Sequence, residues 1–157
     1  MPPPIIIDPN TFDYEHPIAT AERIRRFNPQ AHEFALLDAI VYADQENMIF
    51  AGYHEIRPDD WWVRGHVPGR PLFPGVLMIE CAAQLASYLT HDLLNFEGFM
   101  GFAGVDGVKF RGTVTPPCRF VVVGRGKSIK PRRSVCECQG FVEGTMVFEA
   151  EITGMRV

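Results

Sequence analysis

The longest regular pattern in the chain is GVLMIECAAQLASYLTHDLL, residues 75–94, which has no proline, no internal glycine and almost no β-branched residue. It predicts a helix of about twenty residues, roughly 30 Å long. Pro74 suits the first turn, and Asn95 with Gly98 marks the exit. Apolar residues occupy most sides of this helix. One polar stripe runs along it, formed by Glu80, Gln84, Ser87 and His91. A helix of this kind must be wrapped by other elements.

Segments rich in β-formers lie on both sides of the helix. Upstream, residues 33–43 and 47–56 are typical of a hairpin with DQE between its strands. Downstream, strands are predicted over 99–110, 118–126, 134–144 and 145–155, with turns at TPP, KSIKPRR and EGT. The order of these elements predicts an α+β fold in which an antiparallel sheet curls around the central helix.

The N-terminal part is proline-rich and aperiodic as far as residue 19. We expect an arm that lies over the domain or is partly disordered. A short helix is predicted over residues 20–28, with Thr20 as its cap and Pro29 just past its end. The chain is therefore divided into an N-terminal arm, residues 1–23, and one domain, residues 24–157.

Composition favours a soluble globular protein, with 46% hydrophobic and 22% charged residues in 157. No run approaches the ~18 apolar residues of a membrane span, so no membrane insertion is expected. The first residues lack the basic segment of a secretory signal, which favours a cytoplasmic location with reduced cysteines. Cys81, Cys118, Cys136 and Cys138 contain no C-x-x-C pair, and no metal site is expected.

Charge is distributed unevenly around the net value of −4. Between Gly107 and Cys136 there is no acidic residue, but there are eight basic ones. This segment is either a solvated hairpin or a docking surface for an acidic partner. Nucleic acid is the less favoured partner, because exposed aromatics are not interleaved with the basic residues.

The most informative stretch is HVPGRPLFPGVLMIE, residues 66–80. Its three prolines exclude helix over residues 66–73 and hold His66 on a stiff loop just before the helix. The first turn of that helix offers free backbone N–H groups at about Gly75 and Val76. A base beside such an oxyanion site suits removal of a proton α to a carbonyl. The alternative is a structural histidine, which is the commoner outcome for a single His.

Glu80 lies about five residues into the helix among aliphatic neighbours. An exposed helical glutamate is the alternative, but exposure is hard to arrange on this face. A carboxyl group desolvated in an apolar pocket has a raised pKa and can act as an acid near neutral pH.

GHVPGRPLFPGVLMIECAAQ resembles the signature G-H-F-P-G-x-P-x-x-P-G-V-L-x-x-E-A-x-A-Q of the 3-hydroxyacyl-acyl-carrier-protein dehydratases of the hotdog fold. FALLDAI and FAGVDGVKFRGTVTP are similar to that family's FLLVDRV and FAGIDKARFRKPVVP. The resemblance covers about residues 24–155. A glutamate at position 80 fits the FabZ-type branch, since the sister group that also isomerises the double bond typically has aspartate there.

The resemblance implies a homodimer with shared active sites, which in this family often assembles further as a trimer of dimers. His66 of one subunit would take the C2 proton, Glu80 of the other would protonate the C3 hydroxyl, and the Gly75 amide would hold the thioester carbonyl. No metal or organic cofactor is implied, because the acyl chain arrives on the phosphopantetheine of an acidic acyl carrier protein. The implied substrate-binding residues are Gly75, Val76, Trp62, Val63, Phe73 and Gln84. The implied carrier-docking residues are Lys109, Arg111, Arg132 and Arg133.

The chain departs from the family pattern around this motif. DDWWVRGH replaces N-E-x-F-F-x-G-H, so Trp62 and Val63 stand for two phenylalanines that resemble tunnel-lining residues. PQAHEFALLDA replaces PHRYPFLLVDR, and TPPC replaces VPGD. Two other functions therefore stay open: a hotdog acyl-thioesterase, and an acyl-binding subunit without turnover.

Overall fold

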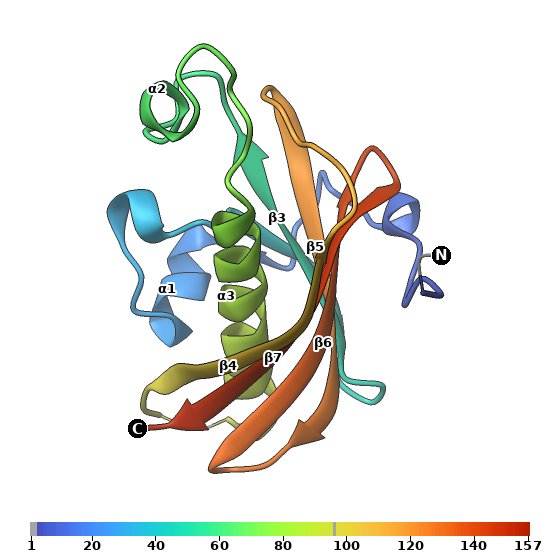
Figure 1. The fold of residues 1–157 in the computed structure, drawn as a ribbon. Coiled ribbons are helices and arrows are strands. Elements are labelled where there is room, and N and C mark those ends of the chain that lie inside the picture. Colours follow the sequence, from blue (N-terminus) through green and yellow to red (C-terminus); the bar gives the residue numbers. More distant parts are fainter. Residues whose placement is uncertain (1–2, 96) are drawn as a thin grey trace.

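A curved antiparallel sheet wraps one long helix in the computed structural model, which describes residues 3–95 and 97–157 (Figure 1). The seven strands follow the order β1-β2-β3-β5-β6-β7-β4. Their bounds are β1 Ala19–Thr20, β2 Ala39–Asp44, β3 Ile49–Ile56, β4 Met100–Phe110, β5 Cys118–Ile129, β6 Arg133–Val142 and β7 Thr145–Arg156. The helices are α1 Ala21–Phe27, α2 Val63–His66 and α3 Gly75–Leu94, with 3₁₀ turns at Pro9–Thr11 and His32–Phe34. The predicted α+β layout is confirmed.

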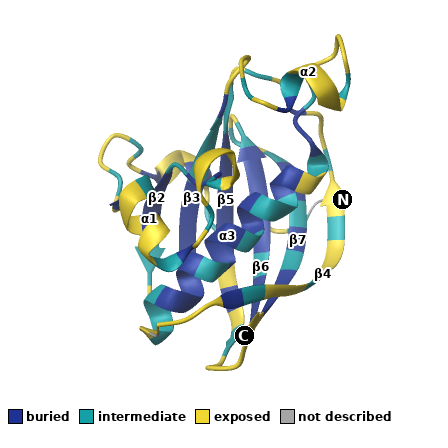
Figure 2. Ribbon diagram, turned by 90° about the vertical axis from the view of Figure 1, so that its left-hand side faces the viewer, coloured by how far each residue is buried: buried dark blue, intermediate teal, exposed yellow. Residues whose placement is uncertain are grey.

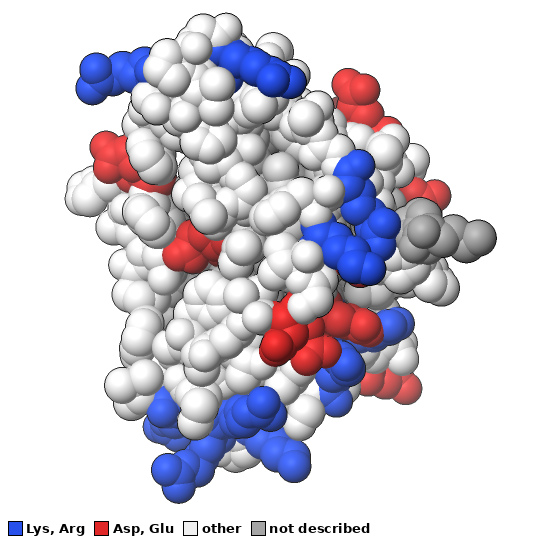
Figure 3. Space-filling model, viewed as in Figure 1, with Lys and Arg blue, Asp and Glu red and all other residues white. Residues whose placement is uncertain are grey.

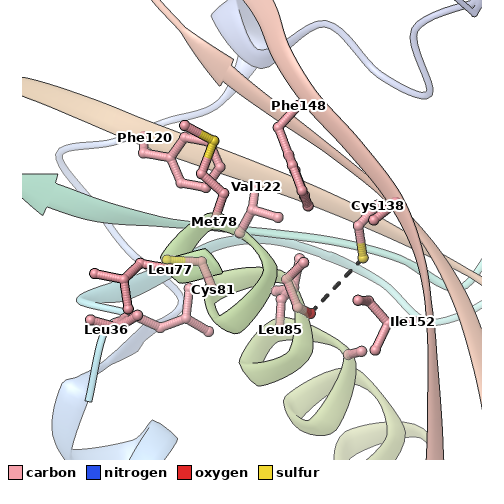
Figure 4. Packing of buried hydrophobic residues seen from close by; sticks show 14 of the residues in the cluster. Leu36, Leu77, Met78, Cys81, Leu85, Phe120, Val122, Cys138, Phe148 and Ile152 are labelled. Atoms are coloured by element: carbon pink, nitrogen blue, oxygen red, sulfur yellow. Dashed lines mark hydrogen bonds between the residues drawn. The ribbon is translucent and has the colours of Figure 1, made fainter. Parts of the chain in front are cut away.

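The central helix α3 has the predicted bounds. It begins directly after Pro74 and ends at Asn95, which is left-handed at φ 48° and donates its N–H to the His91 carbonyl. Its apolar side packs into the concave face of the sheet (Figure 4). The helix contributes Leu77, Met78, Cys81 and Leu85, and the strands contribute Phe120, Val122, Cys138, Phe148 and Ile152. This layer forms the main core.

The polar stripe of α3 is covered rather than exposed. Gln84 is 3% exposed, and its amide binds the preceding segment through three hydrogen bonds: from Leu36 N at 3.1 Å, from Leu37 N at 3.4 Å and to Phe34 O at 2.7 Å. Farther along, His91 contacts the carbonyl oxygens of Ser87 and Gly98 with opposite ring nitrogens. Residues of the polar stripe therefore form hydrogen bonds to residues 34–37, before the helix, and to Gly98, after it.

Three predicted boundaries were wrong. The strand expected over 33–43 begins only at Ala39, because Gln84 occupies the amides of Leu36 and Leu37. The turn expected over KSIKPRR is confined to residues 130–132, since β5 and β6 extend toward each other. Finally, His66 is not in an extended loop. It is the last residue of α2, where its N–H donates to the Trp62 carbonyl at 2.9 Å.

Residues 6–14 of the N-terminal arm lie on the convex face of the sheet, opposite α3 (Figure 1). The side-chain amide of Gln139 accepts from Ile6 N and donates to Pro4 O, both at 2.9 Å. Phe12 packs on Tyr42 with ring centroids 5.2 Å apart, within a second apolar cluster. The arm therefore covers apolar residues of the strands. Of the two expectations for the arm, the one that placed it over the domain agrees with the structure. Residues 1–2 of the predicted arm lie outside the described residues.

Strand β4 forms one edge of the sheet and pairs with β7 on one side only. Much of it is exposed in Figure 2. Phe102 and Phe110 are each about half exposed, and Val105 is exposed as well. A long apolar strand edge is a ready site for pairing with another strand.

Candidate active site

His66 is held by a hydrogen bond to the loop that follows it. The short helix α2 stops at His66 because Val67 precedes Pro68 and adopts an extended conformation at φ −137°. The chain then folds back so that the Nδ1 atom of His66 lies 2.9 Å from the carbonyl oxygen of Leu72. A carbonyl oxygen only accepts, so Nδ1 carries the proton and Nε2 keeps its lone pair. The arrangement presents Nε2 as a base.

An apolar pocket of about 430 Å³ lies beside His66, and residues of the first turn of α3 line it. His66, Phe73, Gly75 and Val76 all line it, so the structure brings four of the predicted site residues together. Pro74 provides no side-chain cap for the helix. The first-turn amides of α3, with the positive end of the helix dipole, therefore suit an oxygen that gains negative charge.

Phe110 also lines this pocket and was not among the predicted residues. A Cβ atom on Gly75 would lie only 2.8 Å from the Phe110 ring, so the ring packs directly on the Gly75 backbone. The motif FAGVDGVKFRGTVTP contained Phe110, but only the fold places it against the start of α3. The glycine at position 75 is thus explained by close packing.

Trp62 and Val63, the other predicted apolar residues, lie at the start of α2. Trp62 is buried, meets Phe73 edge-on with ring centroids 5.4 Å apart, and lines a second apolar pocket of about 310 Å³ with His66 and Val76. Val63 begins α2 and is half-buried. His66 thus lines two apolar pockets, each of a size that suits an acyl chain.

Glu80 occupies a different pocket, of about 90 Å³, between α3 and the first residues of β4. Burial raises the pKa of its carboxyl group, and a hydrogen bond from Gln84 acts against this increase. Gln84 thus lies beside the acid and also anchors residues 34–37. His66 does not line this pocket. Within one chain, the structure does not bring the predicted base and acid together.

These features agree with the comparison to known families. A model of the FabA-like domain matches residues 28–151. The chain belongs to the FabA-like domain family. Solved structures with the same architecture confirm the hotdog fold of this FabA-like chain.

Three solved structures illustrate the range of FabA-like and related hotdog proteins. The dehydratase heterocomplex ApeI:P from Xenorhabdus doucetiae has a TM-score of 0.72 at 13% identity, over 85% of this chain and 90% of that one. AziG from S. sahachiroi has a TM-score of 0.64 at 14% identity, over 84% and 98%. A hypothetical thioesterase protein with coenzyme A from Streptococcus pneumoniae TIGR4 has a TM-score of 0.56 at 9% identity, over 71% and 80%. At these identities the likeness concerns the fold.

The predicted docking residues of this FabA-like domain occupy two regions. Lys109 is exposed near the end of β4, while Arg111 is half-buried and bonded to the Glu149 carboxylate at 2.7 Å. Arg132 and Arg133 are exposed at the β5–β6 turn. In Figure 3, blue side chains accordingly lie over the lower end of the sheet as well as near its middle. None of the described helices has the length and apolar character needed to cross a lipid bilayer.

Proposed function

We propose that the protein dehydrates 3-hydroxyacyl thioesters to trans-2-enoyl thioesters. The observation that carries this proposal is the orientation of His66, whose Nε2 is left as a base beside an apolar pocket and the start of α3. Membership of the FabA-like family supports it.

In the proposed reaction, the His66 pocket supplies the base and the Glu80 pocket supplies the acid. Nε2 of His66 takes the proton from C2, and the electrons of that bond move toward the thioester carbonyl. The Gly75 amide at the helix start stabilises the oxygen as it becomes enolate-like. Glu80, whose carboxyl pKa is raised by burial, gives its proton to the C3 hydroxyl. The C3–O bond then breaks, and the products are the 2-enoyl thioester and water.

The base and the acid would come from two subunits of a homodimer. Phe110 lines the His66 pocket and Phe102 lines the Glu80 pocket, at opposite ends of β4. Phe102 and Phe110 are eight residue steps apart along the strand, or roughly 25 Å. The free β4 edge could pair in antiparallel fashion with the same edge of a second copy. The Phe110 end of one β4 strand would then lie beside the Phe102 end of the other. The His66 pocket of one protomer would then meet the Glu80 pocket of its partner.

The same pairing would gather the basic residues around each site. Lys109 adjoins Phe110 of the His66 pocket, and Arg133 adjoins Ser134 of the Glu80 pocket. Lys109 of one protomer and Arg132 with Arg133 of the other would flank one entrance. Such a surface fits an acidic acyl carrier protein, which would deliver the substrate on its phosphopantetheine arm without any further cofactor.

The test is to incubate the protein with a 3-hydroxyacyl carrier substrate and to follow both the 2-enoyl product and free thiol. Formation of the enoyl product supports the proposal. Release of free thiol without enoyl product would show a thioesterase, and tight acyl binding without conversion would show an acyl-binding subunit.

A further inference from the structure

One residue of the pocket around Glu80 has a buried polar atom that its described neighbours do not satisfy. Among the described residues, three buried side-chain polar atoms have no hydrogen-bond partner, and two of them are Asn28 Oδ1 and Gln30 Oε1. Both belong to the segment that packs on the middle of α3, since Asn28 donates to the Gln84 carbonyl at 2.9 Å. Gln30 lines the same pocket as Glu80. Buried acceptors in proteins are normally paired with a donor or with ordered water.

The size and lining of this pocket suit water rather than an acyl chain. Its volume of about 90 Å³ exceeds the roughly 15 Å³ that one bound water requires. Its polar members are Gln30, Glu80, Gln84, Ser87, Ser134 and Thr153. The acyl-sized pocket beside His66 is lined mainly by apolar residues instead. The two pockets therefore differ in the chemistry that they accept.

We propose that the Glu80 pocket receives the water expelled from C3 of the substrate, with Gln30 Oε1 as the acceptor that holds it. The inference rests on the dehydratase function proposed above. When Glu80 protonates the C3 hydroxyl and the C3–O bond breaks, the new water has two O–H donors. One returns to the carboxylate that Glu80 has become, and the second requires another acceptor. Gln30 supplies that acceptor in the same small pocket.

Gln30 distinguishes this chain from the family pattern, because it stands where PHRYPFLLVDR has histidine. A glutamine carbonyl accepts a hydrogen bond at any pH, whereas a histidine does so only when neutral. Gln30 therefore offers an acceptor whose capacity does not depend on pH.

The test uses a substrate labelled with ¹⁸O in its C3 hydroxyl. If the pocket holds the expelled labelled water, the reverse reaction adds that water back to the enoyl product before it mixes with bulk water. The substrate that remains with the wild type therefore keeps its label. In Gln30→Met, which has similar volume but only a weakly accepting thioether sulfur, the substrate at the same conversion should have lost at least three times more label. Gln45→Met is the matched control, because the Gln45 amide binds Asp92 at an exposed site. Equal label loss in wild type and Gln30→Met would overturn the proposal.

A crystal structure separates this proposal from the reaction itself. Wild type should show an ordered water within hydrogen-bonding distance of Gln30 and Glu80, and Gln30→Met should lose it while melting at a similar temperature. A dry wild-type pocket would overturn the water site. Absence of any enoyl product would instead overturn the dehydratase function.

Discussion

The Nδ1 atom of His66 lies 2.9 Å from the carbonyl oxygen of Leu72, which leaves Nε2 outside this hydrogen bond, and His66 lines the apolar pocket at the start of α3. Six residues separate the two partners, and three prolines lie within or just beyond this turn. The proline loop thus fixes the tautomer of His66 as well as its position.

The first prediction concerns His66 as the base. His66→Ala should lower turnover about 10³-fold, within the range that a positioned general base contributes. Because His66 is exposed in the chain, the melting temperature should hardly change. His16→Ala, which removes an exposed histidine on the arm, is the control and should keep full activity. Similar losses in both variants would argue against a special role for His66.

Sequence predicted more of the fold than of the site geometry. The helix over residues 75–94 was predicted with its observed bounds, because its apolar pattern, Pro74 and Asn95 all agree on them. The strand near Leu36 was misplaced because its backbone amides bind Gln84, 48 residues away in the chain. The local pattern of apolar and polar residues cannot predict a contact between residues so far apart in the chain.

For the candidate site, too, some features were expected from the sequence and others required the structure. The sequence made His66, Gly75 and Glu80 candidates for the site, and the raised pKa of Glu80 was expected from its aliphatic neighbours. Phe110 and Gln30 were not identified, because only the tertiary structure brings them to Gly75 and Glu80. The separation of base and acid within one chain likewise required the fold.

A second prediction concerns the contact between Gly75 and Phe110. In Gly75→Ala, the new methyl group would lie 2.8 Å from the Phe110 ring, so the ring or the helix start must shift. A displacement of about 1 Å at a reacting centre costs up to 10²-fold, and we expect turnover to fall at least tenfold. Gly65→Ala is the matched control, since nothing lies within 4 Å of its added Cβ. Unchanged turnover in Gly75→Ala would show that this contact is not needed.

The third prediction follows from the raised pKa of Glu80. Because burial favours the neutral acid, the folded protein binds this proton more tightly than the unfolded chain does. This contribution to stability is complete below the unfolded pKa of about 4.5 and is lost as pH rises through the folded pKa. Glu80→Gln should therefore increase the free energy of unfolding at pH 7 and change it little at pH 4. Denaturant titrations at both pH values measure this difference.

The activity of Glu80→Gln should change in the opposite direction. An amide cannot give a proton to the C3 hydroxyl, so turnover should fall at least 10²-fold. In the wild type, the rate should decrease with rising pH as Glu80 ionises, at a pH above the ordinary range of a glutamate. A stability difference that is the same at pH 4 and pH 7 would contradict this account of Glu80.

A fourth prediction concerns the basic residues of the β5–β6 turn. The double change Arg132→Glu and Arg133→Glu should raise KM for a carrier-bound substrate about tenfold or more, because like charges would then meet the acidic carrier. KM for the same acyl group on pantetheine should stay unchanged. Lys127→Glu is the control, since that side chain is paired with Glu151 on the sheet. An equal rise in KM for both substrates would argue against docking at this turn.

The most direct test of the shared site is subunit complementation. His66→Ala chains and Glu80→Gln chains are inactive alone, but a mixed dimer would combine the intact His66 of one with the intact Glu80 of the other. After unfolding and refolding together in equal amounts, half of the dimers are mixed and one of their two sites is complete, so about one quarter of wild-type turnover should return. If turnover stays at the level of the separate variants although mixed dimers have formed, the base and the acid do not meet across two subunits, and the shared site is contradicted.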